Sequence, residues 1–583
     1  MNSWRWWAVL TALGIALSLI LWLWKPARLG AETEAPATFL DSVRQQIQAR
    51  INARNGQGGF DCGGEPICAV SLIPAFYEQR QFAPFWIDDK GLKPSAQKLL
   101  RATAQAEADG LNPNDYHVSV TATLILDLEA RFARHESGQE ARWAELDLLL
   151  TDAFLLFGAH LSGGRVNPQT LHTDWLLTQH SVDMMAALNS VLNQDQLDQT
   201  LEQMRPVNGG YAQLRAALQQ LRMVALDGGW LQVPTGPTLK PKEHNPRVIP
   251  LRQRLIQSGD LAPDEVPENP EYFDPALSAG VSRFQHRHGL EPDGAAGRKT
   301  TEAINVPVAA RIRQVELNLE RIRWLPSDLG PDHIWVNTAD FNLKVVEQNQ
   351  VVLRMRVVVG RPARRTPVFS ALMTYMVINP YWTVTDTIIF QDMLPRIRED
   401  AAYFEKENIK VYYGWEEGSA AIDPTTIDWK AYGKGNFPFR LVQDPGPSNS
   451  LGRYKFMFPN KFSVYLHDTP HRELFGKSKR DFSSGCIRIE NAAGLAAYLF
   501  RDNPEWTAEK IKTVLDSMRQ QVALVKKPIP VHLVYMTAWV DDSGVLQFRN
   551  DIYDRDTELD LALKTRPHSE PPALEMFIPV EEN

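Results

Sequence analysis

The chain has 583 residues, of which 44% are apolar and 23% charged, and its net charge is −8. This length allows several folded domains, and the composition is ordinary for a folded protein. The acidic balance, together with the lack of a long basic run in the sequence, excludes nucleic acid as an expected partner.

The first thirty residues contain an apolar segment long enough to cross a bilayer. Residues 6–24 carry no charge, are bracketed by Arg5 and Lys25, and have tryptophans at both ends. A cleaved signal peptide would have a shorter apolar core and a small-x-small site, which Leu29 weakens near Gly30-Ala31. An uncleaved membrane anchor at residues 1–30 is therefore favoured over cleavage.

The next part of the chain, residues 31–240, is predicted to be a helical domain after a short polar stem. Apolar residues recur at helical spacing from Trp143 to Leu161. His160 and Arg165 are interpreted as a solvated or capping pair, because an isolated pair of this kind is rarely a site.

Two of the three cysteines, Cys62 and Cys68, enclose a Gly-Gly-Glu-Pro-Ile segment. An oxidising compartment would permit a disulfide here, which is favoured over two idle thiols. A metal site would need more ligands than the sequence offers, so no metal is expected. Cys486 is then the odd thiol.

A proline-rich linker precedes a compact unit at residues 241–310, which is predicted to contain three short helices. Asp274-Pro275 is typical of an N-cap followed by the first helical position, and Gly289 is typical of a helix stop. His286 and His288 are two residues apart on a helix and point to different faces, so they predict no zinc site. No cofactor is expected.

From Ile334 onward the apolar period changes from helical to alternating, which predicts a β-rich domain of antiparallel meanders over residues 311–545. An amphipathic helix, 311–324, connects it to the preceding unit. Residues 383–449 are too long for a strand connection and are interpreted as an ordered insert that caps a site. A C-terminal extension and mobile tail, 546–583, follows.

The most informative feature is a histidine followed nineteen residues later by a cysteine: His467 in Tyr-Leu-His-Asp-Thr-Pro and Cys486 in Ser-Ser-Gly-Cys-Ile-Arg. A thiol attacks acyl carbons only as thiolate and needs a base or positive field nearby. Residues 462–467 alternate like a strand, which places Tyr465 and His467 on one polar face. On spacing alone, a buried structural cysteine is an equally good interpretation.

The segment from His467 to Arg488 resembles the signature of the L,D-transpeptidases, cell-wall enzymes with a cysteine nucleophile: a histidine, a gap of this length and S-x-G-C-x-R. Many members have a histidine before the glycine, where this chain has Ser484. The chain also departs from the usual pattern at Thr385, in place of proline, and at Val442, in place of arginine. These departures concern contacts of the capping insert.

Further segments fit the large multidomain branch of the same family in Gram-negative-type envelopes. They include Val359–Pro362, Thr366-Pro367, Asn379–Trp382 and Lys455–Asn460 in the predicted catalytic domain. Segments within 31–240 look like the scaffold domain of that branch, and residues 284–305 resemble its peptidoglycan-binding domain. The resemblance implies a multidomain α+β protein: anchor, helical scaffold domain, three-helix peptidoglycan-binding domain and β-rich catalytic domain with a capping insert.

The resemblance also implies roles for individual residues. Cys486 is the expected nucleophile and His467 the base, with the backbone carbonyl of Asp468 orienting the imidazole and N–H groups near Gly485 and Cys486 holding the oxyanion. Expected substrate-binding residues are Tyr465, Arg488, Trp382 and Ser484. For Arg488 a stem carboxylate and a structural salt bridge are both open, and for Trp382 a groove position and a core position are both open.

The expected activity is 3→3 cross-linking of peptidoglycan through a cysteine thioester with a tetrapeptide stem, with release of D-alanine and acylation by carbapenems. The same nucleophile would also serve an L,D-carboxypeptidase, an endopeptidase or a lipoprotein-attaching enzyme, and a wall-binding scaffold is the non-enzymatic alternative. Expected partners are peptidoglycan stems and glycan, the inner membrane and other cell-wall synthesis proteins. The catalytic domains are expected in the periplasm.

Overall fold

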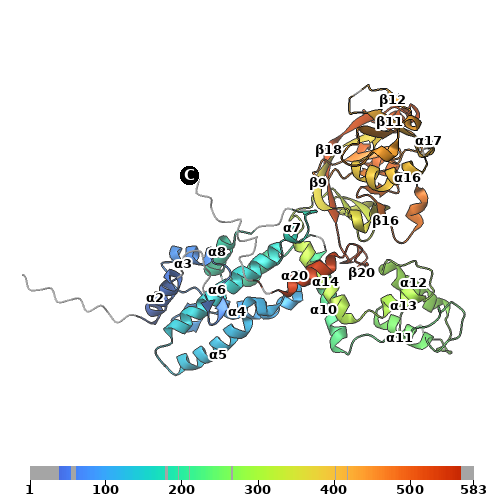
Figure 1. Cartoon of the computed structure of the whole chain (residues 1–583). Coiled ribbons are helices and arrows are strands. Elements are labelled where there is room, and N and C mark those ends of the chain that lie inside the picture. The colour runs from blue at the N-terminus through green and yellow to red at the C-terminus, as the bar shows by residue number, and fades with distance from the viewer. Residues whose placement is uncertain are drawn as a thin grey trace, which may run out of the picture.

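The computed structural model describes residues 38–53, 61–177, 182–194, 196–208, 210–263, 267–400, 402–416, 418–565 and 567. The predicted membrane anchor at residues 1–30 and the predicted mobile tail beyond residue 567 lie outside these residues. Figure 1 shows an elongated helical domain, a β-rich domain and a small helical domain beside it.

The helical domain is built around one long buried helix, α6 (Glu140–Gly163). Every residue from Trp143 to Gly163 is buried, because the other elements of the domain pack against this helix. The helices that pack against it are α2 (Phe39–Asn52), α3 (Leu72–Gln79), α4 (Pro94–Ala104), α5 (Val118–Ala133), α8 (Met184–Gln194) and α9 (Leu197–Met204). The other helices of this part of the chain are α7 (Pro168–Leu171) and α10 (Tyr211–Leu226). Within the described chain, α6 alone has the length and apolarity of a membrane span, and its apolar stretch is wholly buried in the protein.

His160 and Arg165 are structural residues of this helical domain and are not solvated as expected. The His160 side chain is buried and its Nδ1 lies 3.1 Å from the Tyr116 hydroxyl. The Arg165 guanidinium is buried against Asp115, with Nε 3.1 Å from Oδ2. Burial also lowers the pKa of His160 well below its usual value, so this imidazole is neutral at pH 7.

The expected Cys62–Cys68 disulfide is not formed in the structure. A two-stranded hairpin, β1 (Asp61–Cys62) and β2 (Glu65–Pro66), places Cys62 opposite Glu65. The backbone of Cys68 is held elsewhere, by its N–H donating to the buried carboxylate of Asp152 at 3.1 Å. Burial raises the pKa of the Cys62 thiol to about 12, so this sulfur is an inert thiol.

The small domain contains the three helices that the sequence predicts, α11 (Val248–Gln257), α12 (Pro275–Arg287) and α13 (Arg298–Ile304). Asp274 caps α12 by accepting a hydrogen bond from the Leu277 N–H at 2.9 Å, with Pro275 at the first helical position. His286 is exposed and His288 is buried, so the two imidazoles do face different ways. Helix α14 (Val308–Arg323) then connects to the β-rich domain.

The β-rich domain is a closed barrel of mixed strands, whereas the sequence predicted antiparallel meanders. The barrel strands are β6 (His333–Asn337), β7 (Asn342–Glu347), β8 (Gln350–Gly360), β9 (Val368–Ile378), β14 (Tyr454–Met457), β15 (Leu466–His467), β17 (Ile487–Ile489) and β18 (Gln521–Val534). The order is β14-β15-β17-β8-β7-β6-β18-β9, and a β9–β14 pairing closes the ring. The pairs β15–β17 and β6–β18 are parallel.

The predicted strand 462–467 is shorter than expected, because Ser463 has a positive φ of 55° and only β15 is regular. The predicted division of faces is nevertheless present: Val464 and Leu466 are buried in the barrel core. The other elements around the barrel are β16 (Asp481–Ser483), α18 (Ala492–Phe500), α19 (Ala508–Asp516), β19 (Ala538–Val540), β20 (Leu546–Phe548) and α20 (Arg555–Lys564).

The helical domain contributes a strand to the barrel sheet. Strand β5 (Trp175–Leu176) pairs in parallel with the start of β9, with Trp175 opposite Val368. Trp175 lies in the barrel's own hydrophobic core and meets Trp324 edge to face, with ring centroids 5.1 Å apart. The end of the helical domain therefore belongs to the barrel core, whereas the residues around α6 form a separate core.

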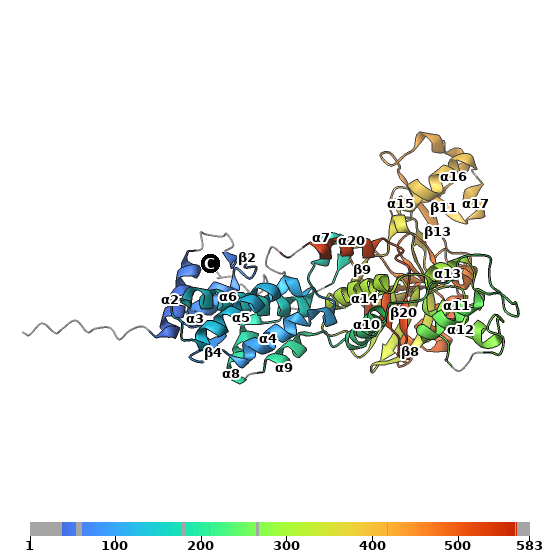
Figure 2. The ribbon, with the colours of Figure 1, turned by 90° about the horizontal axis from the view of Figure 1, so that it is seen from below.

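The insert is an ordered subdomain, as predicted, and Figure 2 shows it projecting from the barrel. It contains a four-stranded antiparallel sheet that the sequence analysis missed: β10 (Trp382–Thr383), β13 (Phe439–Gln443), β11 (Ile409–Tyr413) and β12 (Ala421–Ile422). The helical part of the insert consists of α15 (Asp386–Ile388), a π-helical turn η4 (Ile389–Met393), α16 (Leu394–Glu399) and α17 (Tyr403–Lys406). The insert has its own apolar core, which includes Val411, Trp429 and Leu441.

Candidate active site

Three neighbouring barrel strands bring the site residues into register. In this part of the sheet His467 of β15 is opposite Lys455 of β14 on one side and Arg488 of β17 on the other. Opposite residues on paired strands point to the same face, so these three side chains share one face of the barrel. Leu466 and Ile487, one position along, point into the core and are fully buried.

Cys486 stands at the end of a tight turn that leads into β17. The buried Ser483 hydroxyl donates to the Cys486 carbonyl at 2.5 Å and accepts a hydrogen bond from the Gly485 N–H at 3.1 Å. Gly485 has a φ of +113°, a conformation that favours glycine. The Thr366 hydroxyl donates to the Gly485 carbonyl at 2.8 Å and fixes the turn from outside.

The Gly485 N–H is therefore already used within the turn. The Cys486 N–H has no hydrogen-bond partner among the described residues. Both N–H groups were expected to bind an oxyanion. The Cys486 N–H is available for this purpose, whereas the Gly485 N–H helps to shape the turn.

The environment of the Cys486 thiol contains opposing influences. Burial raises the pKa of the thiol, whereas hydrogen bonds from the backbone and hydroxyl of Tyr465 and the charges of Lys455 and Arg488 lower it. The net direction is upward, so the resting group is a thiol. Tyr465 is thereby placed directly on the sulfur, and the ammonium of Lys455 lies 4.1 Å from the centre of its ring.

The imidazole of His467 is buried and oriented by its own main chain. Its Nδ1 lies 2.6 Å from the backbone carbonyl oxygen of Asp468, the contact expected from the resemblance. Because a carbonyl only accepts, Nδ1 carries the proton and Nε2 is left as the basic nitrogen. Burial, with Arg488 adding a smaller effect, lowers the pKa of His467 to about 3. The resting pair is a neutral imidazole and a thiol.

The Asp468 side chain serves a different purpose from its carbonyl. Its carboxylate accepts the Arg453 N–H at 2.9 Å and pairs with Arg472 at 3.3 Å. Gly452 packs so closely against this carboxylate that a Cβ at that position would collide with it. These contacts fix the loop that presents the carbonyl oxygen to His467.

Arg488 has a half-buried side chain whose Nε is buried and makes no hydrogen bond among the described residues. No carboxylate of the described chain lies within ion-pair distance of it. The sequence left two roles open for Arg488, a structural salt bridge and binding of a ligand carboxylate. No such salt bridge is present among the described residues, so the guanidinium is available to a ligand carboxylate.

Trp382 belongs to the insert. It lies in β10, is partly buried and packs against the apolar core of the insert. This is the core position that the sequence left open. Ser484 does lie beside the nucleophile, and its hydroxyl accepts a hydrogen bond from Arg364 Nη1 at 2.7 Å.

The structure adds residues that the sequence analysis did not single out: Arg361, Arg364 and Asp392. Arg364 and Arg361 project from the segment after β8, and both pair with Asp392 of the insert. Arg361 Nη2 lies 3.0 Å from Asp392 Oδ2. Sequence reasoning could have found the two arginines, because Arg361 lies within Val359–Pro362 and Arg364 lies between that segment and Thr366-Pro367, whereas no sequence pattern indicated Asp392.

Comparisons with known proteins match three parts of the chain to family models. Residues 71–218 match a scaffold domain, residues 244–304 a peptidoglycan-binding domain, and residues 331–517 the L,D-transpeptidase catalytic domain. A curated protein of Haemophilus influenzae, named as an L,D-transpeptidase, is 34% identical over 250 residues, which cover 43% of this chain. The chain spans about half of that relative, 49% of its length.

Solved L,D-transpeptidase structures are also similar, at low identity. One from Stackebrandtia nassauensis is 12% identical, covers 52% of this chain and 97% of its own, and has a TM-score of 0.20. One from Mycobacterium smegmatis is 11% identical, covers 35% of this chain and 58% of its own, and has a TM-score of 0.16. Residues 331–517 thus match the L,D-transpeptidase catalytic domain, and the curated relative supports the same family.

Proposed function

We propose that the protein is an L,D-transpeptidase that forms 3→3 cross-links in peptidoglycan through a thioester on Cys486. The observation that supports it best is the arrangement on β15 and β17. Cys486 directly precedes Ile487, and Ile487 pairs with Leu466, the neighbour of His467. The Nε2 atom of His467 remains basic because Nδ1 donates its proton to the backbone carbonyl of Asp468. A nucleophile with an oriented base is what acyl transfer needs.

In the first half-reaction, His467 Nε2 takes the proton of the Cys486 thiol as the sulfur attacks the carbonyl carbon of the third stem residue. The Cys486 N–H stabilises the oxyanion, and the Tyr465 hydroxyl stabilises the sulfur while it is negative. The C–N bond to the terminal D-alanine then breaks, and His467 returns the proton to the departing amine. The product is the thioester.

In the second half-reaction, the side-chain amine of diaminopimelate on another stem attacks the thioester carbonyl. A new amide bond forms, the C–S bond breaks, and the amine proton returns to sulfur through His467. Arg488 would bind a stem carboxylate during both halves, since its half-buried side chain has no carboxylate partner of its own among the described residues.

Muropeptide analysis after overexpression tests this function directly. The wild-type chain should raise the amount of 3→3 dimers, and Cys486→Ala should not, at equal protein level. Shortened stems without dimers would indicate an L,D-carboxypeptidase, and stems joined to protein would indicate lipoprotein attachment. An unchanged profile from the wild-type chain would support the wall-binding scaffold.

We also propose that residues 1–30 anchor the protein in the inner membrane, with the other domains in the periplasm. The proposal is supported by the uncharged length of residues 6–24 and their aromatic ends. Membrane-extracted protein should retain Met1 in terminal sequencing. A mature chain starting near Glu32 would show cleavage, and a cytoplasmic C-terminal reporter would contradict the proposed orientation.

A further inference from the structure

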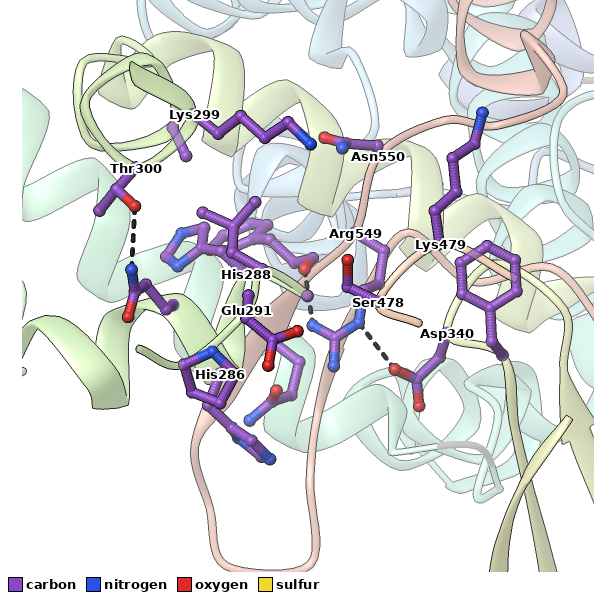
Figure 3. A pocket seen from close by; sticks show the side chains of 18 of the residues that line it. His286, His288, Glu291, Lys299, Thr300, Asp340, Ser478, Lys479, Arg549 and Asn550 are labelled. Carbon is purple, nitrogen blue, oxygen red and sulfur yellow. Dashed lines mark hydrogen bonds and ion pairs between the residues drawn. The ribbon is translucent and has the colours of Figure 1, made fainter. Parts of the chain in front are cut away.

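A large cleft, lined by neither His467 nor Cys486, lies between the peptidoglycan-binding domain and the barrel (Figure 3). We call it the interdomain cleft. One wall is the end of α12 and the start of α13; the other is the barrel segment 476–480, with β19, β20 and Arg549 between them. Its volume of about 1810 Å³ is larger than the few hundred to 1,000 Å³ or so of small-molecule sites, so it suits a polymer.

The two walls of the interdomain cleft are joined by direct contacts of Arg549. Arg549 bridges them, with Nε 2.7 Å from Asp340 Oδ1 on the barrel side and Nη1 donating to the Arg287 carbonyl at 3.0 Å. Gly289, with a φ of +66°, allows this approach, because a Cβ there would lie 2.5 Å from Arg549 Cδ. The interdomain cleft is therefore preformed and does not depend on a ligand to bring its walls together.

A second contact reinforces the joint from the side of α12. The imidazole of His288 stacks between Phe284, at a centroid distance of 3.8 Å, and Phe548 of β20, at 5.4 Å. Burial lowers the pKa of His288 well below its usual value, so the ring is neutral and this aromatic stack carries no charge at pH 7.

Both walls of the interdomain cleft carry exposed, charged side chains. Lys299 projects from the peptidoglycan-binding side and Lys479 from the barrel side, as Figure 3 shows, with Lys477 close by in the sequence. The Lys479 ammonium forms an ion pair with Asp481 at 3.1 Å, but the Lys479 side chain is still 67% exposed. Trp539 also lines the cleft, but the Arg549 guanidinium lies over its ring, 4.9 Å from the centroid, and the residue packs against the barrel core.

Acidic side chains are also present. Glu291, Asp541 and Asp542 line the same cleft, and Asp542 is paired with Arg354. A lining with both signs of charge complements a ligand that carries both carboxylates and an ammonium group. A peptide stem with diaminopimelate has this combination, and the glycan to which it is attached supplies the length.

The barrel wall of the interdomain cleft is continuous with the candidate active site. The segment between His467 and Cys486 forms η7 (Arg472–Gly476), then the cleft residues 476–480, then β16 and the turn of the nucleophile. Arg480 holds this segment on the barrel by donating to the carbonyls of Phe341 and Val357, at 3.1 and 3.2 Å. One short stretch of chain thus borders both the cleft and the thiol.

We propose that the interdomain cleft binds a peptidoglycan strand through both domains, and that the stem of this strand reaches Cys486 along the 472–485 segment. Lys299 and Lys479 bind stem carboxylates. The peptidoglycan-binding domain and the barrel therefore form one composite site. The proposal rests on the proposed function for its ligand.

Binding is best measured without turnover, by cosedimentation of the Cys486→Ala chain with purified sacculi. Adding Lys299→Glu and Lys479→Glu should raise the sacculus concentration for half-binding about tenfold, because two charge-assisted contacts become repulsive. A second pair, Lys299→Glu with Lys477→Glu, leaves the Lys479–Asp481 contact intact. The matched control is Lys512→Glu with Lys527→Glu, two exposed lysines elsewhere on the barrel domain.

Equal binding by the cleft variants and the control pair would overturn the proposal, provided that all melt at the wild-type temperature. Because this readout uses an inactive chain, its outcome does not depend on which reaction Cys486 performs. A failure of the proposed function would instead appear in the muropeptide profile of the wild-type chain.

A second measurement tests the path to the thiol. With Cys486 present, soluble glycan strands that carry stems should slow its alkylation by iodoacetamide severalfold, read at Cys486 by mass spectrometry. The Lys299→Glu/Lys479→Glu pair should need about tenfold more strand for the same protection, since protection follows occupancy. Identical protection curves for this pair and the wild-type chain would show that strands reach Cys486 without the cleft.

Discussion

Arg364 of the barrel and Asp392 of the insert face each other across the boundary between the two units, with Arg364 Nη2 3.0 Å from Asp392 Oδ1. The same guanidinium donates through Nη1 to the Ser484 hydroxyl, two residues before the nucleophile. A single side chain therefore connects the position of the insert to the turn that carries Cys486.

Breaking this ion pair should loosen the insert over the site. Asp392→Asn is expected to speed alkylation of Cys486 by a bulky maleimide about fivefold, because a part-exposed ion pair contributes about 1 kcal/mol. Hydrogen exchange of residues 386–399 should rise in parallel. Asp400→Asn, which removes an exposed pair with Lys406 inside the insert, is the control and should change neither readout. Equal effects from both variants would assign the result to insert stability.

The choice of base can be tested against a neighbouring histidine. His467→Ala should slow acylation of Cys486 by a carbapenem about 10²–10⁴-fold, as the loss of a general base does. His471→Ala, whose side chain is 60% exposed, should stay within about twofold, as surface substitutions away from the reacting groups do. Intact-mass kinetics measure both. Comparable losses would mean that the imidazole of His467 is not the base.

The acylation rate should not show the fall near neutral pH that a histidine base with an ordinary pKa would cause. The pKa of His467 is about 3, so its imidazole stays unprotonated as the pH falls from 7 to 5, and the base is lost only in stronger acid. The carbapenem acylation rate should therefore change little over that interval, measured by stopped flow within the range where the fold is intact. A limb near pH 6.5 would show that His467 titrates like an exposed histidine.

A second pH prediction concerns alkylation of the Cys486 thiol in the resting protein. Because burial raises the pKa of Cys486 above its ordinary 9.0, alkylation by iodoacetamide should be slow at pH 7 and climb only in alkaline solution. A pH-independent plateau from pH 6 upward would instead indicate a thiolate–imidazolium pair in the resting enzyme.

Arg488 distinguishes ligand binding from stability. Arg488→Gln should raise KM for a tetrapeptide donor about tenfold, since a charge-assisted bond to a carboxylate is lost. The melting temperature should not fall, because the guanidinium has no carboxylate partner to lose within the described chain. A lower melting temperature with unchanged KM would favour a structural role for this arginine.

Local signals account for the parts of the fold and site that could be predicted. Asp274, Pro275 and Gly289 delimit helix α12 through contacts a few residues away, and this helix was predicted correctly. His467 and Cys486 are close in sequence, so their segments could be associated before any strand pairing was known. In these cases the determining interactions span short stretches of chain.

The rest depends on partners far apart in sequence. Nothing local indicates that β15 and β17 are parallel, that Asp392 meets Arg364, or that the two-residue strands β10 and β12 complete a sheet. Cys62 and Cys68 show the same limit, because the buried carboxylate of Asp152 determines where the Cys68 backbone lies. Tertiary contacts decide these features.

The pairing of β5 with β9 has a consequence for the order in which the chain is made. Trp175 leaves the ribosome long before Val368, its partner across the sheet. At synthesis rates of about 5–20 residues per second, the strand and its indole wait about 10–40 seconds for the rest of their core. During that interval the helical domain presents an unpaired strand edge and an exposed tryptophan, so the nascent chain, more than the finished protein, is the form that needs protection from aggregation.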